Sequence, residues 1–252
     1  MADFLTSDGL RLSYRTWGPT DGTPVVLHHG FAANASTNWE SPGVVAALVD
    51  QGRRVVAIDA RGHGASDKPH DPARYGEVRM AQDLGELVTR LGCEAIDLVG
   101  YSMGAVVSLV FASTDPRVRR LVVGGVGEGV VVCGGVDLRA LPSVALAEVL
   151  EADLIAADTD PGLVAFRAFA ELMGSDRLAL AAQARSMHRD PIALDRITVP
   201  TLVLAGDADP LAAHPDRLRQ ALPDARLVSL AGDHLGVVRN PEFARAIVDF
   251  VT

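Results

Sequence analysis

Short apolar runs rich in Val, Ile and Leu recur along this chain, and each is followed by glycine, alanine or a polar residue. They occupy residues 25–27, 54–58, 95–99, 121–123, 201–205 and 226–230. Near-continuous runs of this kind are typical of strands that are covered on both faces, as in a parallel sheet. No other feature limits the fold as much, because consecutive parallel strands need a crossover between them, usually a helix.

Helical patterns lie between several of these runs. Residues 42–48 precede the second run, and residues 80–91 carry apolar side chains at helical spacing. Asn240 and Pro241 suit the first positions of a C-terminal helix. Asp8-Gly9 predicts a hairpin turn near the N-terminus. We therefore expect an α/β fold with a mostly parallel central sheet of about eight strands and helices on both faces.

One region interrupts the alternation of strand and helix. Between about residues 127 and 196 only Val130–Val132 suggests a strand, whereas residues 143–152, 161–173 and 175–187 suggest helices. Either this region is a helical cap inserted over the sheet, or it continues the α/β pattern through strands that are not recognised. We favour the insertion, with a core formed by residues 1–126 and 197–252 and a cap formed by residues 127–196.

Composition narrows the class of protein and its partners. The chain of 252 residues has a net charge of −9 and no cluster of Lys and Arg, which argues against binding to nucleic acid. Cys93 and Cys133 do not have the spacing of a metal site or of a disulfide framework. The N-terminus lacks the features of a secretory signal, and no apolar stretch is long enough to span a bilayer. The expectations are therefore a cytoplasmic location, no membrane partner and a small-molecule ligand.

Gly100-Tyr101-Ser102-Met103-Gly104 is the strongest chemical signal in the sequence. It follows the run at 95–99 and precedes a helical run at 105–112. A serine on a sharp turn between a strand and a helix presents its hydroxyl above the edge of the sheet, and the flanking glycines let other segments pass close by. The alternative is an ordinary turn in which Ser102 caps the helix.

A serine hydroxyl needs a base to become a nucleophile. The histidines of the chain are His28, His29, His63, His70, His188, His214 and His234. Only His234 lies in a loop that follows a late strand and precedes the last helix, where catalytic groups of such sheets gather. His29 and His63 are expected to have structural roles, and His70, His188 and His214 are expected at the surface or in the insertion.

Three carboxylates could orient that base by fixing its tautomer. Asp207 and Asp209 follow the run at 201–205, and Glu128 follows the run at 121–123. We favour Asp209, with the other two as alternatives.

Together these segments resemble the α/β-hydrolase superfamily over essentially the whole chain. The resemblance rests on His28-His29-Gly30-Phe31, on residues 59–66 (Asp-Ala-Arg-Gly-His-Gly-Ala-Ser), on the turn at Ser102, on residues 206–209 and on Gly232-Asp233-His234. The order Ser, Asp, His along the chain is also that of the family. Ala105 and Asp233 depart from it, because many relatives have glycine at both positions.

The resemblance implies Ser102 as nucleophile, Asp209 as acid and His234 as base. It also implies that the backbone N–H groups of Phe31 and Met103 form an oxyanion hole and that the helical insertion is the cap of the family. The function implied is hydrolysis of a carboxylic ester or similar acyl bond through an acyl-enzyme, without a metal or another cofactor.

Substrate contacts are expected from Phe31, Trp39, Met103, Phe166 and Phe169, and the apolar cap favours a small or medium uncharged acyl group. The alternatives are other chemistry with the same three residues, such as lactone opening, carbon–carbon hydrolysis, acyl transfer or lyase chemistry. A binding module with slow turnover is a further alternative.

Overall fold

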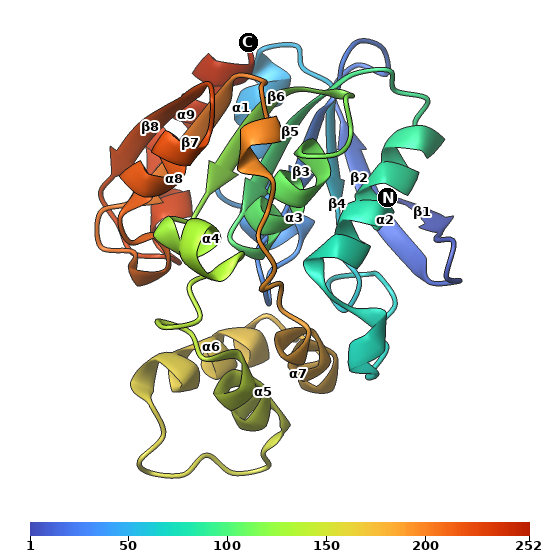
Figure 1. Cartoon of the computed structure of the whole chain (residues 1–252). Helices are drawn as coiled ribbons and strands as arrows, with labels where there is room; N and C mark the ends of the chain where they lie inside the picture. Colours follow the sequence, from blue (N-terminus) through green and yellow to red (C-terminus); the bar gives the residue numbers. More distant parts are fainter.

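An eight-stranded sheet forms the centre of the molecule (Figure 1). The structure is a computed structural model and describes residues 1–252. The strands are β1 (Ala2–Leu5), β2 (Arg11–Trp17), β3 (Val25–His28), β4 (Val55–Ile58), β5 (Ile96–Tyr101), β6 (Val118–Gly124), β7 (Thr201–Gly206) and β8 (Ala225–Leu230). Their spatial order is β1-β2-β4-β3-β5-β6-β7-β8. The predicted α/β fold with about eight strands is confirmed.

The β1–β2 hairpin pairs antiparallel, with Leu5 opposite Arg11 around the predicted Asp8-Gly9 turn. Strand β2 also pairs antiparallel with β4, and every other pair in the sheet is parallel. The carboxyl ends of β3 to β8 therefore meet at one edge of the sheet, where polar residues that follow each strand can converge.

Side chains of each central strand alternate between two apolar layers. In β3, Val25 and Leu27 pack with helices α1 (Val44–Asp50) and α9 (Pro241–Val251). Val26 packs in the larger cluster with helices α2 (Glu77–Arg90) and α3 (Met103–Ala112). Because both faces are covered, the strands read as continuous apolar runs in the sequence.

The helices match most of the predicted positions. They are α1 (Val44–Asp50), α2 (Glu77–Arg90), α3 (Met103–Ala112), α4 (Glu128–Cys133), α5 (Ser143–Glu151), α6 (Pro161–Leu172), α7 (Arg177–Arg185), α8 (Pro215–Ala221) and α9 (Pro241–Val251). Single helical turns occupy Ser36–Glu40, Pro72–Arg74, Leu194–Arg196, Pro210–Ala212 and Val237–Arg239. Asn240 caps α9 as predicted, because its side chain accepts a hydrogen bond from the N–H of Glu242 at 3.0 Å. Helix α8 was not expected from the sequence.

The segment between β6 and β7 is helical throughout, with α5, α6 and α7 set apart at one end of the sheet (Figure 1). The strand suggested at Val130–Val132 is wrong, because these residues belong to α4. Helix α7 begins after Asp176, not Ser175, and the Asp176 carboxylate accepts hydrogen bonds from two N–H groups of its first turn. The proposed boundaries of core and cap, at residues 127 and 196, remain a prediction.

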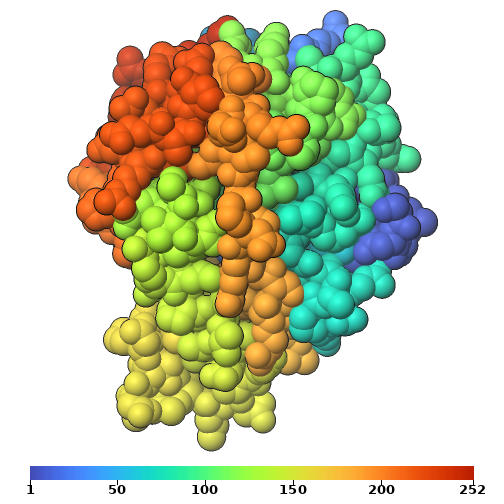
Figure 2. All heavy atoms as spheres, in the orientation of Figure 1, coloured from blue at the N-terminus to red at the C-terminus, as the bar shows by residue number.

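Two stretches of backbone connect the cap helices to the sheet, one after α4 and one after α7, and they lie against each other at residues 134–135 and 188–190. A Cβ at Gly134 would lie 2.3 Å from the carbonyl oxygen of Asp190, and one at Gly135 would lie 2.6 Å from that of His188. Only glycine permits this approach. Figure 2 shows the returning segment, in orange, on the surface beside the green residues of α4.

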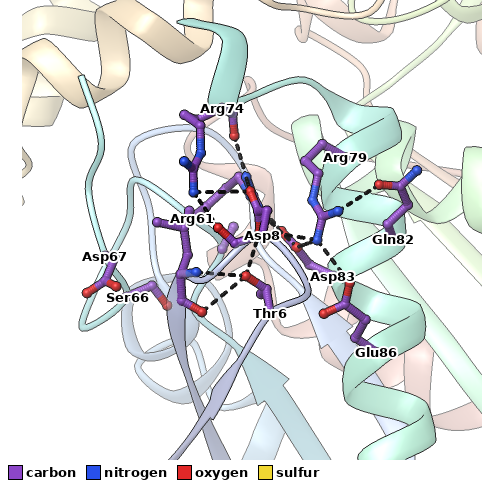
Figure 3. Close-up of polar contacts among 12 residues, drawn as sticks. Thr6, Asp8, Arg61, Ser66, Asp67, Arg74, Arg79, Gln82, Asp83 and Glu86 are labelled. Atoms are coloured by element: carbon purple, nitrogen blue, oxygen red, sulfur yellow. Dashed lines mark hydrogen bonds and ion pairs between the residues drawn. The ribbon is translucent and has the colours of Figure 1, made fainter. Parts of the chain in front are cut away.

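A buried arginine joins the hairpin, the loop after β4 and helix α2 (Figure 3). The Arg61 side chain is fully buried and donates to Asp83 from Nε and Nη2, both at 2.7 Å, and to Asp8 at 3.1 Å. Arg79 also contacts Asp83, at 2.9 Å. This network holds the segment of residues 59–66 against the core.

None of the helices combines the length and the apolarity that crossing a bilayer demands.

Candidate active site

Ser102 lies on the turn between β5 and α3, in a backbone conformation that L-residues rarely adopt (φ 54°, ψ −117°). The turn is closely surrounded by other backbone. A Cβ at Gly100 would lie 2.2 Å from the carbonyl oxygen of Gly104, and one at Gly104 would lie 2.2 Å from that of His28. The two glycines of the pentapeptide therefore permit the turn, as predicted, and the strain is maintained by its surroundings.

His234 lies within hydrogen-bond distance of both Ser102 and Asp209. Its Nε2 is 3.0 Å from Ser102 Oγ, and its Nδ1 is 2.8 Å from Asp209 Oδ2. The three side chains come from the loops that follow β5, β7 and β8, and all three residues are buried. Their atoms form a continuous relay from carboxylate to imidazole to hydroxyl.

The other carboxylates near these loops have different partners. Asp207 accepts a hydrogen bond from the N–H of Gly232 at 3.0 Å, and Glu128 pairs with Arg139 at 2.7 Å. Asp233 does not face the relay, because its Oδ1 accepts from the N–H groups of Leu235 and Gly236. Of the three candidate acids, the structure brings only Asp209 to His234.

The expected oxyanion-hole donors lie beside Ser102. Gly30, which precedes Phe31, is so near that a Cβ on it would lie 3.3 Å from Ser102 Cβ. Met103 is the first residue of α3, so its N–H has no acceptor within the helix. Neither the Phe31 nor the Met103 N–H donates to an acceptor in the protein. Both are free to bind an oxygen that carries developing negative charge.

Two side chains that the sequence did not indicate hold the loop that follows β3 and contains Gly30 and Phe31. Asn38 Oδ1 accepts from the N–H of Gly30 at 2.9 Å. Asp59 accepts from the N–H of Ala35 at 2.8 Å and from that of Ala65 at 2.9 Å, and so ties two loops together. Asp59 is the first residue of the motif at residues 59–66, but the sequence does not predict its contact with Ala35, 24 residues earlier.

Tyr101, also missed, supports the base. Its hydroxyl donates to the carbonyl oxygen of His234 at 2.6 Å, and the two rings lie 5.3 Å apart. Burial raises the pKa of Tyr101 well above its ordinary value, so the hydroxyl stays protonated and remains a donor.

Three of the other histidines lie inside the protein and outside the relay. Burial lowers the pKa of His28 and of His63 to about 4, and it also lowers the pKa of His29. His29 Nε2 accepts from the N–H of Ala60 at 3.0 Å, in keeping with its expected structural role. His70 lies at the surface, 3.0 Å from Asp176.

A cavity of about 550 Å³ opens onto Ser102 and His234. Phe31, Phe166, Phe169 and Met173 line it. The side chains of Trp39 and Met103 do not: both are buried in the apolar layers on either side of the sheet. Helix α6 thus supplies the apolar wall that faces the serine.

No group of three or more His, Cys, Asp or Glu side chains is arranged to hold a metal ion.

Comparison with known proteins places this site in a family. The chain belongs to the α/β-hydrolase family: residues 23–126 match the model of the alpha/beta hydrolase fold, and the full-length similarities agree. It is 30% identical to 2-hydroxy-6-oxo-2,4-heptadienoate hydrolase of Pseudomonas putida, over 91% of this chain and 89% of that protein. It is 32% identical to a non-heme chloroperoxidase of Streptomyces lividans, over 75% of this chain but 58% of that protein.

A solved structure agrees with this assignment. A hydrolase from Pseudomonas aeruginosa PA01 superposes with a TM-score of 0.77 at 30% identity, over 99% of this chain and 97% of that one.

Proposed function

We propose that this chain is a serine hydrolase that cleaves a carboxylic ester, or a similar acyl bond, of a small to medium substrate. The observation that carries the proposal is the relay of Asp209, His234 and Ser102, with contacts of 2.8 and 3.0 Å. A serine, a histidine and an acid in this geometry are the groups that acyl transfer requires.

The first half of the reaction forms an acyl-enzyme. Ser102 Oγ attacks the carbonyl carbon while His234 Nε2 takes its proton, and Asp209 stabilises the imidazolium that results. When the tetrahedral intermediate collapses, the bond to the alcohol breaks and the alcohol takes the proton from His234.

The second half releases the acid. Water loses a proton to His234 and attacks the acyl carbon, and Ser102 leaves with that proton. In both halves the oxygen of the tetrahedral intermediate accepts hydrogen bonds from the N–H groups of Phe31 and Met103. One such donor contributes a factor of about 10²–10³ in rate.

The cavity supports a substrate of limited size. A volume of about 550 Å³ is within the usual range for small-molecule sites. Phe166, Phe169 and Met173 make the cap side of this cavity apolar, which suits an aliphatic or aromatic portion of the substrate.

Ser102→Ala tests the proposal. We expect the variant to fold and to lose turnover of 4-nitrophenyl acyl esters, and a fluorophosphonate should label Ser102 in the wild type alone. Ser113→Ala is the matched control, because Ser113 lies at the end of α3 and donates only to the Val110 carbonyl oxygen. Activity in Ser102→Ala equal to that of the wild type would overturn the proposal, and labelling without turnover would favour a binding module.

Hydrolysis of a carbon–carbon bond is the second candidate, because a relative that matches most of this chain is named as a heptadienoate hydrolase. The same three residues can attack a ketone carbonyl. A panel of simple esters, lactones and a vinylogous diketone separates the bond classes. Preference for the diketone by kcat/KM would favour the second candidate over the first.

A further inference from the structure

Asn38 carries a hydrogen-bond donor that the protein leaves without an acceptor. The residue is only 5% exposed, and its Oδ1 accepts from the N–H of Gly30 at 2.9 Å. Because that backbone N–H can only donate, the amide cannot be flipped, and Nδ2 must be the end that faces away from Gly30. Asn38 Nδ2 is buried and has no partner in the protein.

The residue that carries this donor is part of the wall of the substrate cavity. Asn38 lines the cavity together with Ser102 and His234. An unpaired buried N–H costs free energy. The cost is offset once an occupant of the cavity supplies an oxygen acceptor.

The position of Asn38 places that acceptor close to the reacting bond. Asn38 bonds to Gly30, and a Cβ on Gly30 would lie 3.3 Å from Ser102 Cβ. Gly30 is followed by Phe31, the expected oxyanion donor. Asn38 is therefore bonded to the segment that lies beside Ser102.

The charges around the cavity favour an oxygen acceptor. No Asp or Glu lines it, and its ionisable lining side chains are Tyr101, which stays protonated, His234 and Arg239. Neither a ketone nor a carboxylate of the substrate would meet a repelling charge.

We propose that Asn38 determines specificity: Asn38 Nδ2 donates a hydrogen bond to a keto or carboxylate oxygen of the substrate, close to the bond that is cleaved. The inference rests on the proposed hydrolase function and names the class of substrate. It departs from the expectation of an uncharged acyl group, because a carboxylate is one of the two acceptors that it names.

The test compares esters that differ at one carbon. On the acyl side, ethyl 4-methylpentanoate, ethyl 4-oxopentanoate and monoethyl succinate carry a methyl group, a ketone and a carboxylate on one skeleton. On the alcohol side, isobutyl butyrate is compared with the butyrate ester of hydroxyacetone. Hydrolysis is followed by titration of the released acid at pH 8.

Two variants separate the donor from its structural role. Asn38→Asp keeps an oxygen for the N–H of Gly30 and replaces the amide donor, whereas Asn38→Leu removes both. Gln183→Leu is the matched control: Gln183 is also a buried amide without partners, but it does not line the cavity.

We expect the wild type and Gln183→Leu to prefer an oxygen-bearing ester over its methyl analogue about tenfold in kcat/KM. This preference should appear in the acyl series, in the alcohol series or in both. Both Asn38 variants should reduce that ratio to about one. A ratio near one in the wild type would overturn the inference. It would also be overturned if both Asn38 variants slowed all esters equally and left the ratio unchanged, and Asn38 would then be only a support for the oxyanion loop. Absence of any Ser102-dependent hydrolysis would instead contradict the proposed function itself.

Discussion

Tyr101 donates a hydrogen bond to the backbone carbonyl oxygen of His234 at 2.6 Å. The residue next to Ser102 in the sequence therefore holds the loop that carries His234, 133 residues later. Because the Tyr101 hydroxyl is buried and stays protonated, this link does not change with pH in the physiological range. The distance between Ser102 and His234 thus depends on a side chain that takes no part in the chemistry.

Tyr101→Phe should lower kcat about 5- to 10-fold with little change in KM, because the His234 loop loses one anchoring hydrogen bond of about 1 kcal/mol. Steady-state kinetics on a 4-nitrophenyl ester measures this. Tyr75→Phe is the control, since the Tyr75 hydroxyl makes a similar bond to the Pro69 carbonyl oxygen at 2.6 Å outside the site. Equal losses of kcat in the two variants would contradict a positioning role for Tyr101.

Asp209→Asn should lower kcat by about 10⁴-fold, because an amide cannot stabilise the imidazolium and favours the wrong tautomer of His234. Asp207→Asn should have a small effect, since an amide oxygen can still accept from the N–H of Gly232. Stopped-flow or steady-state assays of both variants against the wild type check the difference. If Asp207→Asn were the more damaging change, the assignment of the acid would be reversed.

Arg61→Met should destabilise the fold by about 3–5 kcal/mol, because it leaves the buried carboxylate of Asp83 without its main partner. Burial raises the pKa of Asp83, and the Arg61 and Arg79 cations oppose that shift. Urea denaturation measures the change. Arg11→Met, which breaks half-exposed pairs with Asp3 and Asp67, should cost no more than about 1 kcal/mol, and a similar loss there would contradict the argument.

Glu77→Gln should raise Tm at pH 8 by several degrees and leave it nearly unchanged at pH 5. Burial raises the pKa of Glu77 from 4.5 to about 7, although its carboxylate accepts from the N–H of His188. Between pH 4.5 and about pH 7 the folded chain keeps a proton that the unfolded chain releases. The free energy of unfolding therefore falls as pH rises through this range, by up to about 3 kcal/mol. Glutamine has no such proton to lose.

Differential scanning calorimetry of Glu77→Gln, of the wild type and of the exposed control Glu94→Gln measures this pH dependence. A constant difference in Tm at both pH values would show that Glu77 is ionised throughout.

The strands could be predicted from sequence because burial on both faces leaves continuous apolar runs. The same signal wrongly predicted a strand at Val130–Val132. These β-branched residues belong to α4, which lies between Gly127 and Gly134, and Gly134 has a left-handed backbone conformation. Local propensity was outweighed there by the packing of the cap segment.

The relay could be predicted because Ser102, Asp209 and His234 each follow a strand and gather at one edge of the sheet. Asn38 and Tyr101 could not, since their roles depend on contacts with backbone atoms of distant segments. Trp39 was expected in the cavity because it is aromatic and near Phe31, but it points into the apolar layer beneath α1 and α9.

The helices α4 to α7 interrupt the chain between β6 and β7, yet these two strands are paired directly, with Leu121 opposite Thr201. Ser102 precedes the interruption, and Asp209 and His234 follow it. A single proteolytic cut between α5 and α6 would therefore yield two polypeptides, neither of which contains all three residues of the relay. The β6–β7 ladder would still join the two pieces in one nicked molecule.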